Sequence, residues 1–160
     1  RNYPEDFLVY TIPPYLNPAP ADFVRGKKPL LNHPGEYYWR TGYYCSIADN
    51  PDYYKGHVVI LGDERTISMA EFTMMALQTA PKSKVIGSQT AGADGNVSVS
   101  YLPGGITANF SGIGIYYPDG RPTQRIGIVP DIEVKPTVAG IRAGKDEVLE
   151  RAIEYIENNP

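Results

Sequence analysis

The fold is decided by residues 57–87, which read HVVILGDERTISMAEFTMMALQTAPKSKVIG. The run His57–Gly62 is short, apolar and closed by a glycine, a pattern typical of a buried parallel strand. Apolar residues at helical spacing predict a helix over Ser68–Thr79, and a proline ends it. Lys84–Gly87 is predicted to be a second strand. Strand, helix and strand within about 30 residues predict a βαβ unit with two parallel strands.

The segments that follow add further elements to this unit. Val97–Tyr101 and Ile106–Ser111 flank the turn Leu102–Gly105 and predict an antiparallel hairpin. Ile113–Tyr117 is predicted to add another strand. Arg142–Asn158 carries its apolar residues on one face, so an amphipathic surface helix is expected there. These patterns together indicate an α/β protein.

Prolines recur throughout residues 1–56, so this part is expected to be irregular, with at most one short helix near Glu5–Tyr10. We treat 1–56 and 57–160 as two parts of a single domain. Since the chain begins with Arg1 and not with methionine, we expect a piece of a longer protein. Five aromatic residues are expected to form a strand or a loop packed over the core: Tyr37, Tyr38, Trp39, Tyr43 and Tyr44.

Composition excludes several classes of function. The 160 residues are 42% hydrophobic and 21% charged with a net charge of −3, which gives no electrostatic case for binding nucleic acid or a membrane surface. No apolar run approaches the ~20 residues that span a bilayer. Cys45 is the single cysteine, so an intrachain disulfide is impossible. No Cys/His spacing indicates a metal, and we predict neither a metal nor another cofactor. The oligomeric state stays open.

Ser68 is the residue best placed for covalent chemistry. Sites in α/β sheets gather where a strand leads into the next helix, and Ser68 lies at the start of the predicted helix. Backbone N–H groups there lack intrahelical acceptors and can stabilise an oxyanion beside an attacking hydroxyl. The residues alone leave an alternative open, because Ser68-x-x-Glu71 also matches a capping box in which the serine only caps the helix.

Three ordered motifs point further than this local chemistry. They are VVILGDERTISMAEFTMMALQ from Val58, VIGSQTAGADG from Val85, and RIGIVPDIEV from Arg125. The first resembles the nucleophile segment of the tail-specific (C-terminal-processing) serine proteases. The second resembles that family's glycine–threonine–glycine loop, and the third its Gly-x-x-Pro-Asp segment. The opening RNYP resembles the remainder of the family's Asp-Leu-Arg-Asn strand end.

The resemblance implies a crotonase/ClpP-like α/β core and a serine endopeptidase that acts on a peptide or protein substrate. It implies that Ser68 is the nucleophile and that the N–H of Met69 stabilises the oxyanion. A second oxyanion donor is expected in the Asn2–Tyr3 region. Family members in bacteria are typically exported, so a periplasmic or cell-envelope location is expected by resemblance.

The general base is the difficult part of this interpretation. Many relatives place a lysine in the loop as Thr-x-Gly-Lys-Gly, but that position is Ala93 here, and a methyl group cannot accept a proton. The tricorn-like branch uses an upstream histidine, and His57 and His33 are poor substitutes. The branch's acid position corresponds to Gln124, which could orient a histidine, and Asp94 is an alternative orienting group or a simple turn residue.

The sequence therefore supports more than one function. The leading prediction is a serine peptidase core whose base lies upstream of these 160 residues, so that this piece alone is inactive. The first alternative is a non-catalytic relative kept for peptide binding or scaffolding. A crotonase-type acyl-CoA enzyme is disfavoured because nothing in the sequence suggests a nucleotide pocket.

Overall fold

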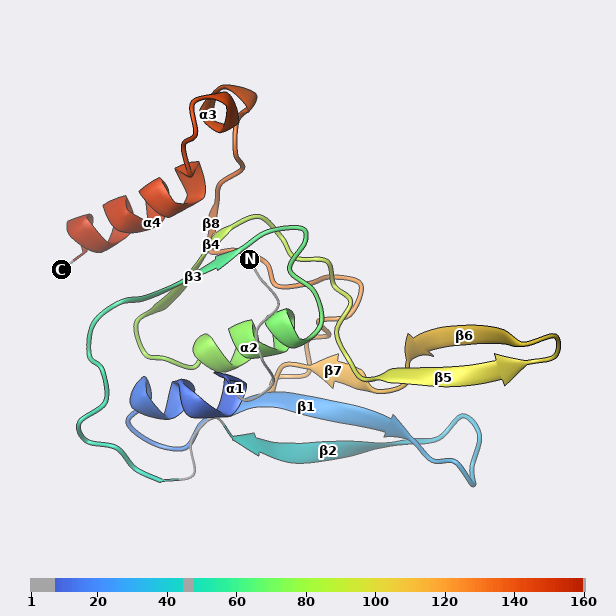
Figure 1. Cartoon of the computed structure of the whole chain (residues 1–160). Coiled ribbons are helices and arrows are strands. Elements are labelled where there is room, and N and C mark those ends of the chain that lie inside the picture. The colour runs from blue at the N-terminus through green and yellow to red at the C-terminus, as the bar shows by residue number, and fades with distance from the viewer. Residues whose placement is uncertain (1–7, 45–47, 160) are drawn as a thin grey trace.

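The computed structural model describes residues 8–44 and 48–159, and its parallel sheet confirms the predicted βαβ unit (Figure 1). Strand β3 (Val58–Gly62) and strand β4 (Ser83–Gly87) run parallel over their whole length. Strand β8 (Ile132–Glu133) extends the sheet beside β4, also in parallel, so the strand order is β3-β4-β8. All three strands end at the same edge, which is where a helix or loop can carry a site.

Helix α2 (Met69–Leu77) connects β3 to β4 and lies between the parallel sheet and a second, antiparallel sheet (Figure 1). Its buried methionines Met74 and Met75 pack in one cluster with Ile60 and Val85 of the parallel sheet and Phe23 of the antiparallel one. Burying apolar surface on both sides holds the helix firmly. The N-terminus of α2 is therefore a rigid position.

The antiparallel sheet corrects the prediction that residues 1–56 are irregular. Strand β1 (Asp22–Pro29) pairs with β2 (Tyr37–Tyr44) on one side and with β7 (Gly114–Tyr116) on the other. The described prolines lie before β1, at its last residue, in the turn that follows and after β2, so they bound the strands and do not interrupt them. Of the five aromatic residues expected to pack over the core as a strand or a loop, Tyr43 of β2 does so, whereas Tyr37, Tyr38 and Trp39 of the same strand are about half exposed.

The beginning of the chain contains two short helical segments. Helix α1 (Leu8–Thr11) overlaps the predicted short helix near Glu5–Tyr10, whose first residues lie outside the described part, as does Cys45. The 3-10 helix η1 (Pro13–Tyr15) follows it. Val9 of α1 is fully buried in the cluster that contains α2, so this segment covers one side of the helix.

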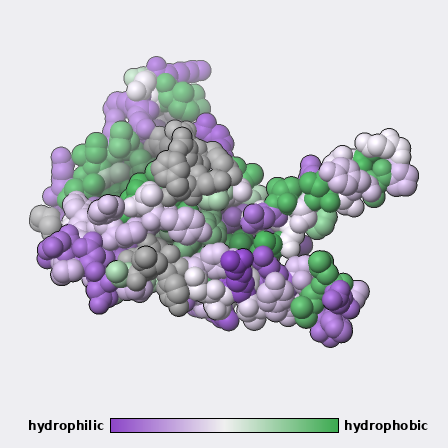
Figure 2. Space-filling view, turned by 60° about the horizontal axis from the view of Figure 1, so that its bottom comes forward, coloured by the Kyte–Doolittle hydropathy of each residue, from purple (hydrophilic) through white to green (hydrophobic). Residues whose placement is uncertain are grey.

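The predicted hairpin is confirmed as β5 (Val97–Leu102) and β6 (Ile106–Ser111), joined by a turn in which Gly104 and Gly105 have positive φ. These two strands pair with each other and with no other described strand. Figure 2 shows two arms that project from the body, with hydrophobic atoms on both. The longer of them is this β5–β6 hairpin, as Figure 1 makes clear.

The C-terminal helix is shorter than the predicted Arg142–Asn158. A separate helix α3 (Val138–Arg142) comes first, the chain turns at Gly144 with φ +68°, and α4 (Glu147–Asn158) begins after Asp146. The Asp146 carboxylate accepts from the N–H of Leu149 at 3.1 Å and caps α4, which fixes where the helix starts. No helix in residues 8–44 and 48–159 is both long and apolar enough to cross a membrane.

One face of α4 covers the outer face of the parallel sheet. Val148 and Ala152 are buried against Ile86, while Leu149 and Ile153, predicted to share the apolar face, stay nearly half exposed. The order of layers is therefore α4, parallel sheet, α2 and antiparallel sheet.

Candidate active site

Ser68 has the backbone conformation of a strained turn. It lies between the Asp63–Ile67 turn and the first residue of α2, with φ +54° and ψ −120°. Residues with a side chain rarely adopt positive φ, and such a conformation costs on the order of 1–3 kcal/mol. Arg125 is the other described non-glycine residue with positive φ. Strain of this kind is concentrated at functional sites, so Ser68 is a candidate on structural grounds.

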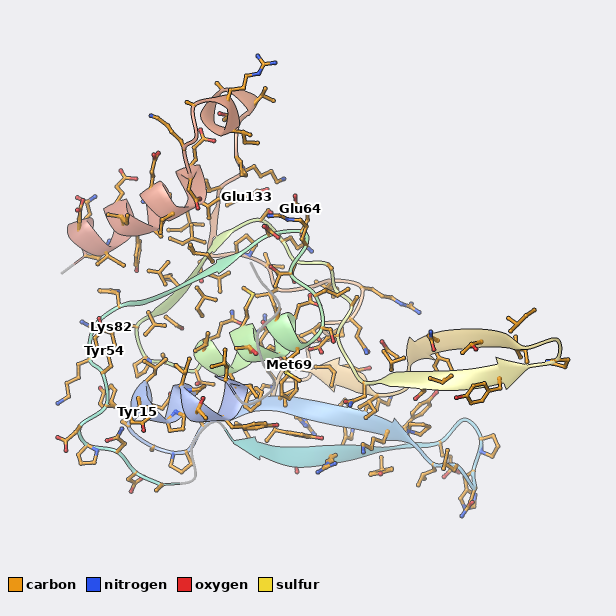
Figure 3. The ribbon with its side chains drawn as sticks, viewed as in Figure 1. Tyr15, Tyr54, Glu64, Met69, Lys82 and Glu133 are labelled. Atoms are coloured by element: carbon orange, nitrogen blue, oxygen red, sulfur yellow. The ribbon has the colours of Figure 1, made fainter. Side chains whose placement is uncertain are left out.

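Ser68 is the N-cap residue of α2 and forms a capping box with Glu71. An N-cap residue usually has an extended backbone, which Ser68 does not have. The Glu71 carboxylate accepts from the N–H of Ser68 at 3.1 Å. Met69 follows as the first helical residue, where an N–H has no intrahelical acceptor. In Figure 3, Met69 lies at the end of α2 that faces β7.

Glu71 joins the serine turn to the loop after β4. Its side chain is fully buried and accepts four hydrogen bonds. Oε2 binds the N–H groups of Ser68 and Ala93, at 3.1 and 3.0 Å. Oε1 binds the hydroxyl of Thr90 at 2.5 Å and the N–H of Gly92 at 2.8 Å. The positive end of the helix dipole also favours a carboxylate in the first turn. This buried group holds both parts of the candidate site in place.

The loop itself is clamped from its other side by the segment before β8. Thr90 Oγ1 accepts from the N–H of Ile128 at 2.7 Å, and the carbonyl of Gly92 accepts from the N–H of Arg125 at 2.7 Å. Gly92 has φ +68°, and a Cβ there would lie 2.9 Å from the backbone nitrogen of Gly127. A glycine is required at this position because both the backbone angle and the space exclude a side chain.

A pocket of about 400 Å³ lies beside Ser68. Its walls come from α1, β2, α2, the β4–β5 loop and β7, so it is assembled from segments far apart in the sequence. Apart from Ser68 and Met69, most of the lining is apolar or aromatic, and Asp94 is the single acidic residue. The other lining residues are Tyr10, Tyr43, Phe72, Gly95, Asn96, Val97, Ile113 and Ile115. Polar and apolar atoms share the surface of this concave site about equally, so it can both cover an apolar group and bind a polar one.

Asp94 is almost completely buried, with 3% of its surface exposed. Burial raises the pKa of its carboxyl to about 7; the hydrogen bond from the N–H of Gly95 opposes the increase, and the nearby charge of Glu71 adds to it. Asp94 Oδ1 accepts that N–H at 2.6 Å, and the buried Oδ2 has no hydrogen-bond partner among the described residues. An unpaired buried carboxyl oxygen is unusual and marks a candidate binding group.

Asp94 is expected to make the protein less stable at alkaline than at acidic pH. Its pKa is about 7 in the folded chain and 3.8 without the fold, so between those values the folded state binds more protons. The free energy of unfolding therefore falls as pH rises from 4 to 7, by roughly 4 kcal/mol at most at 1.4 kcal/mol per pKa unit. Calorimetry at pH 5 and pH 8 should show the part of this loss that falls above pH 5, roughly 3 kcal/mol, in the parent and a smaller loss in Asp94→Asn.

The exposed Asp119, which pairs with Arg121, provides the matched control. Asp119→Asn should keep the parent's loss of stability between pH 5 and pH 8. If Asp94→Asn keeps it too, Asp94 does not titrate in this range in the folded chain.

Gln124 lies behind the pocket and does not line it. Its side-chain nitrogen donates to the carbonyls of Asp94 and Ile113, at 2.7 and 2.8 Å, and its oxygen accepts from the N–H of Ile115 at 3.4 Å. The amide thus joins the Asp94 loop to β7. The orienting role expected from its position in the sequence stays a prediction, because all its described partners are backbone groups.

Neither described histidine lines the pocket. His57 precedes β3, at the end of the strand opposite to Ser68, and its ring packs edge-on against Tyr155 of α4. His33 is exposed in the turn between β1 and β2. Ala93 lies at the predicted loop position and contributes its N–H to Glu71. The expected second oxyanion donor, in the Asn2–Tyr3 region, lies outside the described residues.

Sequence reasoning missed Glu71 and Thr90 as parts of the site. The Ser-x-x-Glu spacing had suggested only a local capping box. The threonine of the glycine–threonine–glycine loop was the available signal, since a conspicuous polar residue between glycines often has a buried partner. Its partner, Glu71, could not be named without the tertiary contact.

A strained serine at the start of a helix, following a parallel strand and beside an apolar pocket, is the arrangement of a serine hydrolase. The chain belongs to peptidase family S41, whose family model matches residues 20–134. The family match confirms the predicted resemblance to tail-specific proteases, and the structure confirms the predicted α/β core. No curated protein matches the chain significantly.

Solved structures share the fold. A protein from Parabacteroides merdae ATCC 43184, described as a candidate peptidase, is 21% identical over 91% of this chain and 45% of its own, with a TM-score of 0.79. Mature CPAF complexed with lactacystin is 26% identical over 71% of this chain and 23% of its own, with a TM-score of 0.57.

The photosystem II D1 C-terminal processing protease is 20% identical over 78% of this chain and 30% of its own, with a TM-score of 0.53. The present chain thus spans less than half the length of each of these three proteins.

Proposed function

We propose that the chain is part of the catalytic core of a serine endopeptidase in which Ser68 attacks the peptide carbonyl. The observation that carries the proposal is the strained backbone of Ser68, held at φ +54° at the start of α2 and beside the pocket. A strained turn of this kind exposes a nucleophile above the helix N-terminus, where helix N–H groups stabilise negative charge.

The proposed reaction is acyl transfer. The Ser68 oxygen forms a bond to the carbonyl carbon, its proton passes to a base, and the N–H of Met69 stabilises the oxyanion. The tetrahedral intermediate then expels the amine, which takes up the proton, and water later hydrolyses the acyl-enzyme. No histidine or lysine among the described residues lines the pocket, so we assign the base to chain outside these 160 residues.

Fluorophosphonate labelling tests this assignment directly. The complete natural protein should label at Ser68, as shown by mass spectrometry of the modified peptide, whereas the 160-residue chain should label at least 100-fold more slowly because it lacks the base. An intact, folded complete protein that does not label at Ser68 would contradict the proposal. It would favour the alternative of a non-catalytic peptide-binding relative, which the apolar pocket also suits.

Export to the periplasm or cell envelope, expected from the resemblance, is part of the same proposal. Fractionation of the source cells followed by immunodetection would test it, and a cytosolic signal would contradict it.

A further inference from the structure

The pocket beside Ser68 combines apolar walls with one buried acid. Tyr10, Tyr43 and Phe72 contribute aromatic surface, and Ile113 and Ile115 contribute aliphatic surface. Asp94, from the β4–β5 loop, supplies the single acidic side chain of the lining, at 3% exposure. Because Ser68 and Met69 line the same pocket, a side chain that fills it belongs to the residue next to the bond under attack.

No described basic group neutralises Asp94. It forms no ion pair, and its one side-chain hydrogen bond comes from its neighbour Gly95. Its Oδ2 is buried and unpaired within the described part of the chain. Burying a carboxyl group without a partner costs several kcal/mol, so a ligand that supplies the missing donor gains correspondingly in affinity.

The charged and titratable groups around Asp94 favour a cation over an anion. Glu71 of α2 acts on Asp94 as a like charge. Tyr10 of α1 and Tyr43 of β2, on the opposite walls, are phenols that carry no charge at neutral pH. The Gln124 amide faces the backbone carbonyl of Asp94 from the β7 side. Arg40 of β2 lies with its guanidinium 5.2 Å from the centre of the Tyr43 ring, and none of the described ion pairs joins it to Asp94. An acidic ligand that reached Asp94 would meet the like charges of Asp94 and Glu71.

Lysine and arginine match this combination of walls and charge. Their long apolar stems cover hydrophobic and aromatic surface while the charged head reaches a polar group. Aromatic rings also attract a cation that passes over their faces. A volume of about 400 Å³ accommodates such a side chain.

We propose that Asp94 makes this pocket a binding site for a basic side chain, so that the peptidase prefers lysine or arginine next to the scissile bond. The proposal rests on the proposed function, since it takes Ser68 as the attacking residue. It adds a substrate class, peptides that are basic at the cleaved position, and a residue that determines it.

The proposal has a definite pH dependence. Since the pKa of Asp94 is about 7, a cationic ligand must displace a proton from the carboxyl at lower pH. The preference for lysine should therefore weaken by up to about tenfold per pH unit below 7 and level off above it. A neutral side chain of equal length should show no such dependence.

The experiment uses the complete natural protein carrying Ser68→Ala, so that peptides bind without being cleaved. Titration calorimetry compares two peptides that differ only in lysine or norleucine at the position next to the bond. At pH 8 the lysine peptide should bind on the order of 10- to 100-fold more tightly. The advantage should fall at pH 6 and disappear when Asp94→Asn is added, whereas Asp119→Asn should leave it intact.

Equal affinities at pH 8, or a preference for norleucine, would overturn the proposal. If Asp94→Asn does not fold, the pH dependence measured with Asp94 present decides the question. Labelling at Ser68 without a lysine preference would support the peptidase proposal and contradict the proposal that Asp94 binds a basic side chain. A lysine preference in a protein that never labels would support the pocket and remove the role of Ser68.

Discussion

Replacing Ser68 with alanine is expected to abolish peptide hydrolysis and fluorophosphonate labelling. The alcohol oxygen forms the acyl-enzyme, and no other group in the pocket can replace it as a nucleophile of the same geometry. Loss of a serine nucleophile lowers kcat by on the order of 10⁴-fold or more. Peptide hydrolysis by the complete natural protein, followed by chromatography, measures the loss. Ser83→Ala is the control. Ser83 is the first residue of β4, and its hydroxyl donates to the carbonyl of Gln78, so its replacement should leave the rate of hydrolysis unchanged.

Two substitutions of Ser68, to alanine and to glycine, are expected to differ in stability although both remove activity. Alanine keeps a Cβ and therefore retains the strain of φ +54°, whereas glycine tolerates that angle. After the entropic cost of glycine in the unfolded chain is subtracted, Ser68→Gly should be about 1 kcal/mol more stable than Ser68→Ala. Thermal unfolding should then differ by about 3 °C. Both variants should be inactive.

A different pattern would contradict these expectations. Hydrolysis that survives in Ser68→Ala would remove the serine mechanism. If Ser68→Gly melts below Ser68→Ala, the positive φ does not store strain in the folded protein, and the main structural argument for a nucleophile turn is lost.

Glu71→Gln is expected to give the largest loss of stability. Four donors converge on the two carboxylate oxygens, and glutamine replaces one oxygen by an NH₂ group that is itself a donor. Two of the four donors then face another donor in a buried site. Each buried donor left unpaired costs about 1–3 kcal/mol, so the free energy of unfolding should fall by about 3 kcal/mol and Tm by about 10 °C.

Activity should fall with stability in this variant, because Glu71 is a positioning residue that ties the Ser68 turn to the Thr90–Ala93 loop. The readout specific to positioning is kcat at a temperature where the variant is fully folded, which should drop at least tenfold while KM changes little.

Glu64→Gln is the matched control for this change. The exposed Glu64 accepts one described side-chain hydrogen bond, from Ser88, so its replacement should change the free energy of unfolding little. Glu71→Gln that melts within 1 °C of the parent would show that the buried hydrogen bonds are not a major support of the site.

Local patterns predicted the elements that depend on local information. The β3–α2–β4 unit has the apolar runs, helical spacing and proline stop that its structure requires, and the β5–β6 hairpin has its Gly104–Gly105 turn. Strand β1 was missed because its cationic residues interrupt any alternation of apolar and polar side chains. In the structure Arg25 and Lys27 lie over the ring of Trp39 on the neighbouring strand, a contact that no local pattern reveals.

The sequence also predicted only some residues of the site. Ser68 and Met69 follow from the strand–helix junction and the resemblance, and both line the pocket. Gln124 was placed from the motif spacing, and its orienting role stays a prediction; in the structure its amide joins the Asp94 loop to β7. Asp94 was predicted as an alternative orienting group or a simple turn residue, and its burial beside residues distant in the sequence, such as Ser111 and Gln124, has no local pattern.

By itself, then, the sequence determined the parallel βαβ unit and the position of Ser68 at a helix start, because both are encoded within about 30 contiguous residues. It also determined the family, through three ordered motifs between Val58 and Val134. Only the tertiary structure decided that Ser68 has a strained backbone, that Glu71 accepts four hydrogen bonds, and that Asp94 is buried beside the serine. The physical reason is that strain, burial and convergent hydrogen bonds depend on groups brought together from distant parts of the chain.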